Sequence, residues 1–247
     1  MKFRSVLMLI FNFKKWEAAL HIFLALFFIS ISSSKIYAQG ISISPVSISL
    51  AAGQMASFLT LTNAGDTNLA FQVRSFEWSS SPEEPYNLTP TDQLLVSPPL
   101  GTIPPHGSQT VRIVLRRAAT SIENSYRILI DQIPPPGPIG TVKVAIRLSI
   151  PLFAAPPSPI SPHLQWSIER STTGTFLTVI NTGEKHQKIY DVSLSNTHKN
   201  IKIKVEKSPY ILPHTAQKWK IPDNIVENNE QITISGKSSE GDFKEKI

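Results

Sequence analysis

The sequence predicts an all-β protein of two sandwich domains, and three observations support this. Short segments in which apolar and polar residues alternate follow one another from Ile41 onward, which is the period of β-strands. Clusters of Gly, Pro, Asn and Ser separate these segments at the spacing typical of antiparallel sandwiches. A proline-rich stretch near the middle divides the strands into two groups, and no convincing amphipathic helix occurs in either.

The first 38 residues have the three parts of a secretory signal peptide. Four basic residues occur among the first 17, an apolar run follows over residues 18–31, and small residues lead to a cleavage site after Ala38. An uncleaved membrane anchor is the alternative, but the run is shorter than the roughly 18 to 20 residues that span a bilayer, and His21 interrupts its start. We therefore expect cleavage and export of the mature chain.

Charge and cysteine content narrow the functional classes. The signal segment contains five of the 24 basic and one of the 18 acidic residues, so the mature chain has a net charge of +2. The sequence pI of about 9.5 thus owes much to the signal, and it does not indicate a nucleic-acid partner. Because the chain has no cysteine, neither disulfides nor thiolate metal sites hold it together.

The N-terminal domain is expected over residues 39–155. Its strand candidates lie between turn clusters such as A-A-G and N-A-G-D, and about seven of them fit one sandwich. They are Ser42–Leu50, Ala56–Thr62, Leu69–Trp78, Leu94–Ser97, Ser108–Leu115, Ser125–Gln132 and a long segment from Thr141 to Phe153.

A stiff linker is expected at residues 156–162, within A-A-P-P-S-P-I-S-P, because prolines disfavour both helix and central strand. A smaller C-terminal β-sandwich is expected over residues 163–247. Its strand candidates are Leu164–Arg170, Thr175–Asn181, Gln187–Ser195, Lys202–Lys207, Gln217–Ile221 and Gln231–Ser235.

The segment T-V-K-V-A-I-R-L-S-I-P-L-F, from Thr141 to Phe153, stands out by its length. Typical strands have about five or six residues, and a long apolar edge strand is normally suppressed because it promotes aggregation. Pro151 near its end favours an edge position, since proline cannot donate a ladder hydrogen bond. Such a strand indicates that a partner uses it, although an ordinary paired sandwich strand is the alternative. A self-capping dimer would hide the strand when no partner is present, and light scattering would detect it.

Four segments together resemble the periplasmic chaperones of the chaperone-usher pilus pathway, the PapD-like family. They are S-P-V-S-I-S-L-A-A-G with F-L-T-L-T-N-A-G, then T-I-P-P-H-G-S-Q-T-V-R-I-V, then Y-R-I-L-I-D-Q-I-P-P-P, and finally V-K-V-A-I-R-L-S-I-P-L-F. The amino-acid sequence of the last segment is more similar to the archaic branch of the family, which is associated with spore-coat-like pilins, than to the classical branch. The resemblance implies two immunoglobulin-like domains in an L- or boomerang-shaped arrangement.

The resemblance also implies a function without covalent chemistry or cofactors. A pilin subunit lacks its last strand, and the chaperone supplies its own by donor-strand complementation before delivering the subunit to an outer-membrane usher. The side chains implied to enter the subunit are Val142, Val144, Ile146, Leu148 and Ile150.

Two basic residues of the family anchor the carboxylate at the subunit's C-terminus, one from the first strand and one from the donated strand. The corresponding positions here are Ser47 or Ile48 and Pro151, none of which is basic. The remaining candidates are Arg147 in the donated strand and Arg127 in its expected neighbour, since guanidinium binds carboxylate by charge-assisted hydrogen bonds.

The resemblance further implies a structural ion pair between Arg112 and Glu123 that orients the two domains. Two exposed charges at strand ends are the alternative interpretation of these residues.

Other classes of function find no support in the sequence. No catalytic or phosphate-loop motif occurs, and the histidines of the mature chain, His186 among them, lack metal-ligand spacing and are expected to be solvated in loops. Trp78, Trp166 and Trp219 are expected in or near the cores. A secreted structural or adhesive protein of tandem immunoglobulin-like domains remains the main alternative. An exported hydrolase or carbohydrate-binding module is the second.

Overall fold

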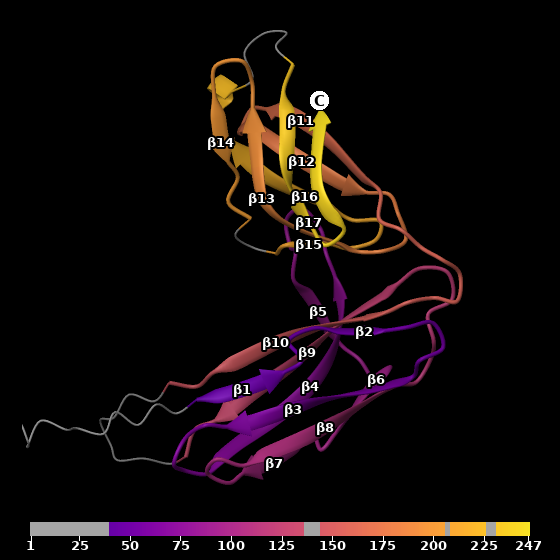
Figure 1. Cartoon of the computed structure of the whole chain (residues 1–247), viewed down its shortest axis with the longest axis vertical. Coiled ribbons are helices and arrows are strands. Elements are labelled where there is room, and N and C mark those ends of the chain that lie inside the picture. The colour runs from indigo at the N-terminus through magenta and orange to yellow at the C-terminus, as the bar shows by residue number, and fades with distance from the viewer. Residues whose placement is uncertain (1–39, 136–143, 206–207, 226–230) are drawn as a thin grey trace, which may run out of the picture. The chain divides into compact units, whose positions relative to one another are not determined.

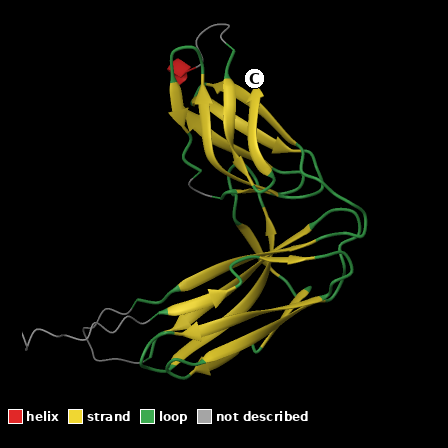
Figure 2. Cartoon of the chain, in the orientation of Figure 1, coloured by secondary structure: helices red, strands yellow, loops and turns green. Residues whose placement is uncertain are grey.

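The computed structural model describes residues 40–135, 144–205, 208–225 and 231–247 (Figure 1). Residues Gly40–Ile247 form one compact unit. The predicted signal peptide lies outside the described residues. Strands and loops make up nearly all of the described chain, with a single 3-10 turn at Asp223–Ile225 (Figure 2). Across the described ranges, no helix is long and apolar enough to cross a membrane.

The N-terminal sandwich has two antiparallel-dominated sheets. One has the strand order β1-β3-β8-β6, and the other has the order β2-β10-β9-β4-β5, with β7 also paired to β4. The strands are β1 Ile41–Ser44, β2 Ile48–Leu50, β3 Ala56–Asn63, β4 Leu69–Ser79, β5 Asn87–Pro90, β6 Leu94–Ser97, β7 Leu100–Ile103, β8 Ser108–Leu115, β9 Asn124–Ile133 and β10 Arg147–Ala154.

The first strand differs from the prediction, because it changes sheets. The prediction of one strand from Ser42 to Leu50 was wrong: β1 pairs antiparallel with β3, whereas β2 pairs parallel with β10 in the other sheet. Pro45 lies between the two strands and has no N–H for a continuous ladder. The chain thereby ties both sheets together at its start.

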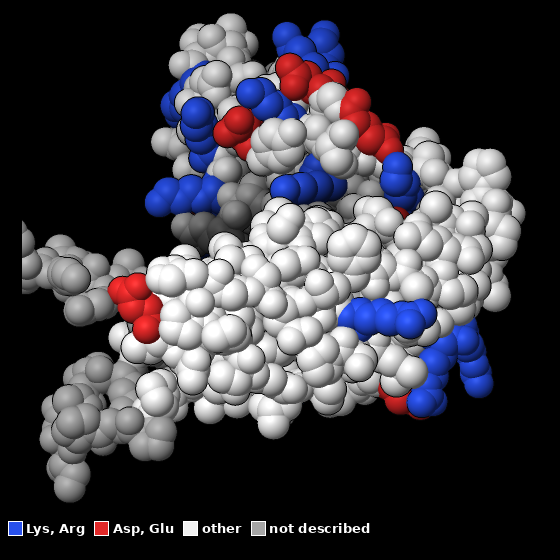
Figure 3. Space-filling view, turned by 60° about the horizontal axis from the view of Figure 1, so that its bottom comes forward, with Lys and Arg blue, Asp and Glu red and all other residues white. Residues whose placement is uncertain are grey.

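The core of this sandwich follows the predicted alternation. In β3 and β9 every second side chain points inward, and Leu59, Leu61, Ile128 and Ile130 are completely buried. Each such side chain stabilises the fold by roughly 1.5 to 3 kcal/mol relative to an exposed one. In Figure 3, the face of the N-terminal sandwich that is turned to the viewer carries few charged side chains. On the C-terminal sandwich, Lys, Arg, Asp and Glu lie side by side.

The C-terminal sandwich also has two sheets. Their strand orders are β11-β12-β16 and β14-β13-β17-β18, with β15 paired to β13. The strands are β11 Leu164–Ser171, β12 Gly174–Asn181, β13 Gln187–Ser195, β14 Asn200–Lys202, β15 Tyr210–Ile211, β16 Ala216–Ile221, β17 Thr233–Ser238 and β18 Gly241–Lys246. Leu177, Val179, Leu194 and Ile234 are fully buried in its core.

The two sandwiches share a repeated unit. The segment F-L-T-L-T-N-A-G covers the end of β3 and the turn after it, and F-L-T-V-I-N-T-G covers the same part of β12. Asn63 donates from Nδ2 to the carbonyl of Ile103 at 3.1 Å, and Asn181 donates likewise to that of Ile211 at 3.2 Å. In both units the backbone N–H two residues later donates to the asparagine Oδ1 at 3.0 Å. Each buried amide therefore holds the turn after its strand against the facing sheet.

No strand occurs between Ala154 and Leu164, where the proline-rich linker was predicted. This segment packs on the N-T-G turn: Thr182 N donates to His163 O at 2.8 Å. A Cβ atom on Gly183 would lie 2.3 Å from Ser161 O, so glycine is required for this close approach.

Several strands were not predicted. β5 and β7 lie in proline-containing segments whose sequence is typical of turns. The sequence of β18, G-D-F-K-E-K, is typical of a charged tail. β5 and β7 pair with the longer strand β4, and β18 pairs with β17, so tertiary pairing overrides weak local preference. The strand predicted from Lys202 to Lys207 overlaps β14, Asn200–Lys202, only at Lys202. Residues 203–205 are not in a strand, and residues 206–207 lie outside the described part.

Candidate functional site

The predicted long strand is shorter in the structure. β10 begins at Arg147 rather than Thr141, and residues 144–146 are not in a strand; residues 141–143, including Val142, lie outside the described part. Gln132 N donates to Ile146 O at 2.9 Å, and Pro134 and Pro135 then follow β9. Because proline cannot donate, β9 offers the residues before Ile146 no further N–H.

The side chains implied to enter a subunit differ in exposure. Val144 is 76% exposed, while Ile146 and Leu148 are half-buried and Leu148 packs against the core. Ile150 is only 5% exposed and belongs to the protein's own core. The alternation therefore runs from an accessible end at Val144 to a buried end at Ile150.

One edge of β10 is open over part of its length. β9 pairs along all of β10, but β2 pairs only with Leu152–Ala154. Since Gln132 N bonds Ile146 O, the even-numbered residues of β10 exchange hydrogen bonds with β9, and the odd-numbered ones face the other edge. The nitrogen of Pro151 faces this edge, as the sequence predicted. Arg147 and Ser149 direct their backbone groups to it, and no described strand pairs with them there.

Arg127 is a buried cation beside this edge. It lies opposite Pro151 on β9 and is 4% exposed. Its guanidinium stacks 3.8 Å from the ring centroid of Trp78, with the rings of Tyr86 and Tyr210 at 5.0 and 5.5 Å. Burial lowers the pKa of Arg127 below its ordinary value, but an arginine side chain remains charged at neutral pH.

The guanidinium of Arg127 is incompletely paired. Nε and Nη2 are buried without a hydrogen-bond partner, and Nη1 lies 3.5 Å from Ser149 O, a marginal contact. No carboxylate among the described residues forms an ion pair with it. Buried donors of this kind normally have hydrogen-bond partners.

Arg147, the other candidate anchor, already has a carboxylate. Its Nε donates to Asp131, which also accepts from Arg74 Nη2 at 2.6 Å. The Arg147 side chain is 61% exposed, whereas Arg127 is buried.

Asp131 gives the fold an acid-dependent contribution. Burial acts to raise the pKa of Asp131, but hydrogen bonds from Arg147 and Arg74 outweigh it and hold the pKa below its ordinary value of 3.8. The charged carboxylate therefore stabilises the fold above about pH 4, and this contribution is lost as pH falls through the lowered pKa.

We expect Asp131→Asn to lower the urea midpoint at pH 7 and to differ less from the parent at pH 3. Asp92→Asn is the control, since its exposed ion pair with Arg116 contributes little; equal shifts in both variants would contradict the prediction.

Aromatic residues from both sandwiches meet next to Arg127. Trp78 and Phe153 pack with Leu212 of the C-terminal sandwich, and the Tyr210 ring meets that of Trp78 edge-on at 5.7 Å. Phe153 stacks on His186 with 3.5 Å between ring centroids. The cage around Arg127 is thus assembled from two domains.

Glu123 also joins the sandwiches, but through a partner that was not predicted. Its carboxylate lies 2.6 Å from His186 Nδ1 and accepts from His186 N at 3.0 Å. Its own N–H donates to Glu184 O at 3.0 Å. Arg112 is exposed on β8 opposite Phe58, and among the described contacts it does not meet Glu123.

The expectation that His186 is a solvated loop histidine was wrong, because its side chain is only 14% exposed. The sequence carries no local signal for this: His186 precedes β13, and Glu123, Phe153 and Tyr210 approach it from distant segments.

Comparisons with known proteins agree with this architecture. Residues 40–159 match the family model described as pili and flagellar-assembly chaperone, PapD N-terminal domain. No curated protein sequence matches the chain.

Among solved structures, the chain is similar to the CsuC–CsuE chaperone–tip adhesion subunit complex from archaic Csu pili of Acinetobacter baumannii. The identity is 23% over 84% of this chain and 97% of that chain, and the TM-score is 0.64. The YadV chaperone gives 18% identity over 84% and 99%, with a TM-score of 0.62. The Salmonella enterica SafA pilin–SafB chaperone complex gives 16% over 87% and 98%, with a TM-score of 0.59. At these identities the likeness establishes the two-domain β-sandwich fold.

Proposed function

Because this chain belongs, through residues 40–159, to the PapD-like family of pili and flagellar-assembly chaperones, we propose that it binds pilus subunits by donor-strand complementation. The observation that carries the proposal is Arg127, a buried cation with unpaired donors at the open edge of β10. A subunit would offer both a strand edge and a terminal carboxylate.

The open edge of β10 provides the main-chain part of the interaction. Arg147 and Ser149 present N–H and C=O groups to a subunit strand, which would extend the sheet beyond β10. Pro151 lacks an N–H at this edge, so pairing would weaken beside Arg127.

The apolar part comes from the alternate side chains before the core. Val144, Ile146 and Leu148, preceded by Val142, would fill the subunit's groove, whereas Ile150 would stay in the chaperone's own core. Burying each of these side chains contributes roughly 1.5 to 3 kcal/mol before the cost of association is subtracted. No covalent step is required, and the family and fold are those of non-enzymatic chaperones.

Arg127 would bind the C-terminal carboxylate of the subunit. The aromatic rings of Trp78, Tyr86 and Tyr210 exclude water from the guanidinium, so an ion pair there is screened less than at the surface. The anchor would set the register of the subunit strand along β10. We further propose that the chaperone acts in the periplasm after signal cleavage and delivers its subunit to an outer-membrane usher.

The test compares two adjacent exposed residues, Val144 and Ala145, which would face opposite sides of a strand formed by this segment in the complex. The tagged chain is co-expressed with a pilin from the same organism, and the pilin recovered in periplasmic pull-downs is quantified. Val144→Asp should reduce recovery about tenfold or more, because it places a carboxylate in the subunit's apolar groove. Ala145→Asp, which adds the same charge on the other face, should leave recovery within about twofold.

Equal recovery with both variants and the parent would contradict strand donation. A pilin that is stable and unbound in every case would favour the alternative of a structural or adhesive protein built of tandem immunoglobulin-like domains.

A further inference from the structure

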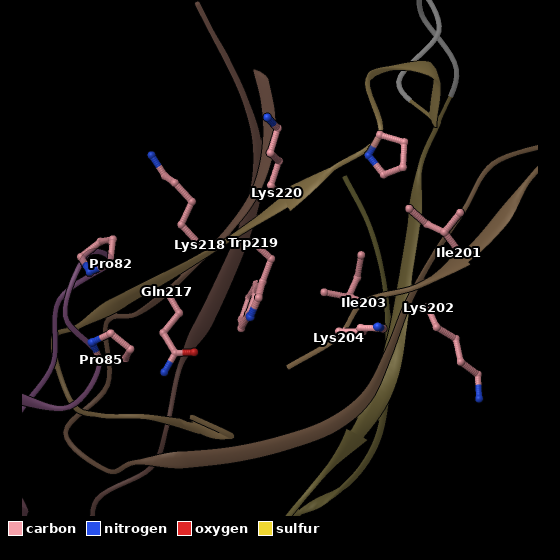
Figure 4. A pocket seen from close by; sticks show the side chains of 11 residues that line it. Pro82, Pro85, Ile201, Lys202, Ile203, Lys204, Gln217, Lys218, Trp219 and Lys220 are labelled. Carbon is pink, nitrogen blue, oxygen red and sulfur yellow. The ribbon is translucent and has the colours of Figure 1, made fainter. Parts of the chain in front are cut away.

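The C-terminal sandwich has an open side that the proposed function does not use. A groove of about 540 Å³ lies between the edge strands β14 and β16, with Pro82 and Pro85 of the β4–β5 connection at one end (Figure 4). Trp219, Ile201 and Ile203 are half-buried and line it. These side chains belong to the edge of the C-terminal core, so this core is incompletely covered here.

Both strands beside the groove have unpaired backbone edges. Asn181 N donates to Thr215 O at 2.9 Å, which fixes the phase of the β12–β16 ladder. Lys218 and Lys220 therefore direct their N–H and C=O groups away from β12. Ile203 N donates to Val192 O at 2.8 Å, so Lys202 likewise faces away from β13. No described strand pairs with either edge.

Charge at the groove is of one sign. Lys202, Lys204, Lys218 and Lys220 are among the residues that line it, and none of the described lining residues is acidic. Glu169, from outside the groove, lies 2.8 Å from Lys218 Nζ and neutralises that lysine, whereas Lys202 and Lys220 keep their charge at the rim. The rim therefore retains positive charge and attracts an acidic ligand.

The directions of the side chains define the ligand more closely. In Figure 4, Lys218 and Lys220 point to the side of β16 opposite Trp219, as strand alternation requires. A strand added to β16 would place every second side chain against Trp219 and Ile203, and the intervening ones beside the lysines. The complementary pattern alternates apolar and acidic residues.

We propose that this groove binds an extended segment of a partner protein in which apolar and acidic residues alternate, by addition of that segment to the edge of β16. An anionic lipid could pair with the lysines and pack on Trp219, Ile201 and Ile203, but it would leave the N–H and C=O groups of both strand edges unpaired. The proposal is independent of β10 and of Arg127, because it uses only the C-terminal sandwich and its neighbouring prolines.

The probe is the peptide acetyl-Glu-Val-Glu-Val-Glu-Val-Glu-amide, which has no terminal carboxylate for Arg127 to bind. It is titrated into the ¹⁵N-labelled protein and followed by NMR at the amides of Lys218 and Lys220 and the indole of Trp219. We expect saturable shifts at these groups and none at β10. The analogue with Lys in place of Glu should bind at least about tenfold more weakly, because like charges meet at the rim.

A pair of variants at one position separates strand addition from simple charge attraction. Lys220→Gln removes the charge and keeps the edge N–H, so binding should fall about two- to fivefold. Lys220→Pro also removes the N–H, which faces away from β12, so β16 should remain folded while binding falls about tenfold below the Gln variant. Unchanged amide signals in β12 would verify that fold.

Other outcomes would overturn the proposal. Equal binding by the Pro and Gln variants would mean that the lysines attract the peptide without strand pairing. Shifts produced at Trp219 by sodium laurate but not by the peptide would identify a lipid site. A dimer of the protein alone that Lys220→Pro dissociates would identify a second copy of this chain as the occupant. Shifts confined to β10 would place the peptide at the donor edge instead.

Discussion

Replacing Arg127 by methionine is expected to weaken binding of a pilus subunit at least about thirtyfold. The side chain is buried under three aromatic rings with two donor nitrogens unpaired, so a subunit carboxylate there would form a desolvated ion pair. Truncating one partner of such a pair typically costs about 2 to 5 kcal/mol of binding. Parent and variant, carrying different tags and co-expressed with a limiting amount of subunit, would report relative affinity as the ratio of subunit recovered with each.

Stability provides the control for this prediction. Methionine fills similar space and removes a buried charge that lacks a carboxylate partner, so the free energy of unfolding should not fall by more than about 1 kcal/mol. Arg147→Met is the matched variant for the other candidate anchor. It should lose little subunit binding, since Arg147 is exposed and already paired with Asp131. The reverse ranking of the two variants would identify Arg147 as the anchor.

Phe153→Ala is expected to give the largest loss of stability, about 3 to 5 kcal/mol. Phe153 is 2% exposed, stacks on His186, and packs with Trp78 and Leu212 where the two sandwiches meet. Its loss leaves a cavity between the two domains. The Glu123–His186 contact then joins the domains without the packing of the Phe153 ring. Urea unfolding followed by tryptophan fluorescence would measure the change.

The matched control for Phe153 is an exposed apolar residue of the same sandwich. Leu100 is 60% exposed on β7, so Leu100→Ala should change stability by less than about 0.5 kcal/mol. Because Phe153 joins the domains, we also expect the variant to unfold in two separated steps where the parent unfolds more cooperatively. A variant within 1 kcal/mol of the parent would mean that the two sandwiches stabilise each other little through this cluster.

Much of the fold follows from local alternation. The core faces of β3, β9 and β12 are visible in the sequence because burial on one side of a strand requires an apolar residue at every second position. The repeated F-L-T-x-x-N-x-G unit was an available signal that the sequence analysis did not use, and it marks the equivalent strand of each sandwich. The strands that escaped prediction, such as β7 and β18, are short or charged and depend on their partners for pairing.

The candidate site could be predicted only in part. The alternation of Val144, Ile146 and Leu148 indicated a surface for a partner, and Arg127 and Arg147 were equal candidates for the anchor. Only the structure shows how their surroundings differ, because Arg147 pairs with the carboxylate of Asp131 and Arg127 meets no carboxylate among the described residues. Which of them anchors a subunit stays a prediction. Such a choice depends on which charges meet across strands, and that information is not local.

The sequence by itself determined two β-sandwich domains, because the fold class depends on periodicity and composition along short stretches. The division between the domains and an apolar segment suited to a partner were predicted from the same signals. Tertiary structure alone decided where β10 begins, which edge of it stays open, and that Ile150 belongs to the core. It also decided that Trp78, Tyr86 and Tyr210 surround Arg127 and that Glu123 meets His186. These contacts join residues far apart in the chain, and they form only when packing of two domains brings distant strands together.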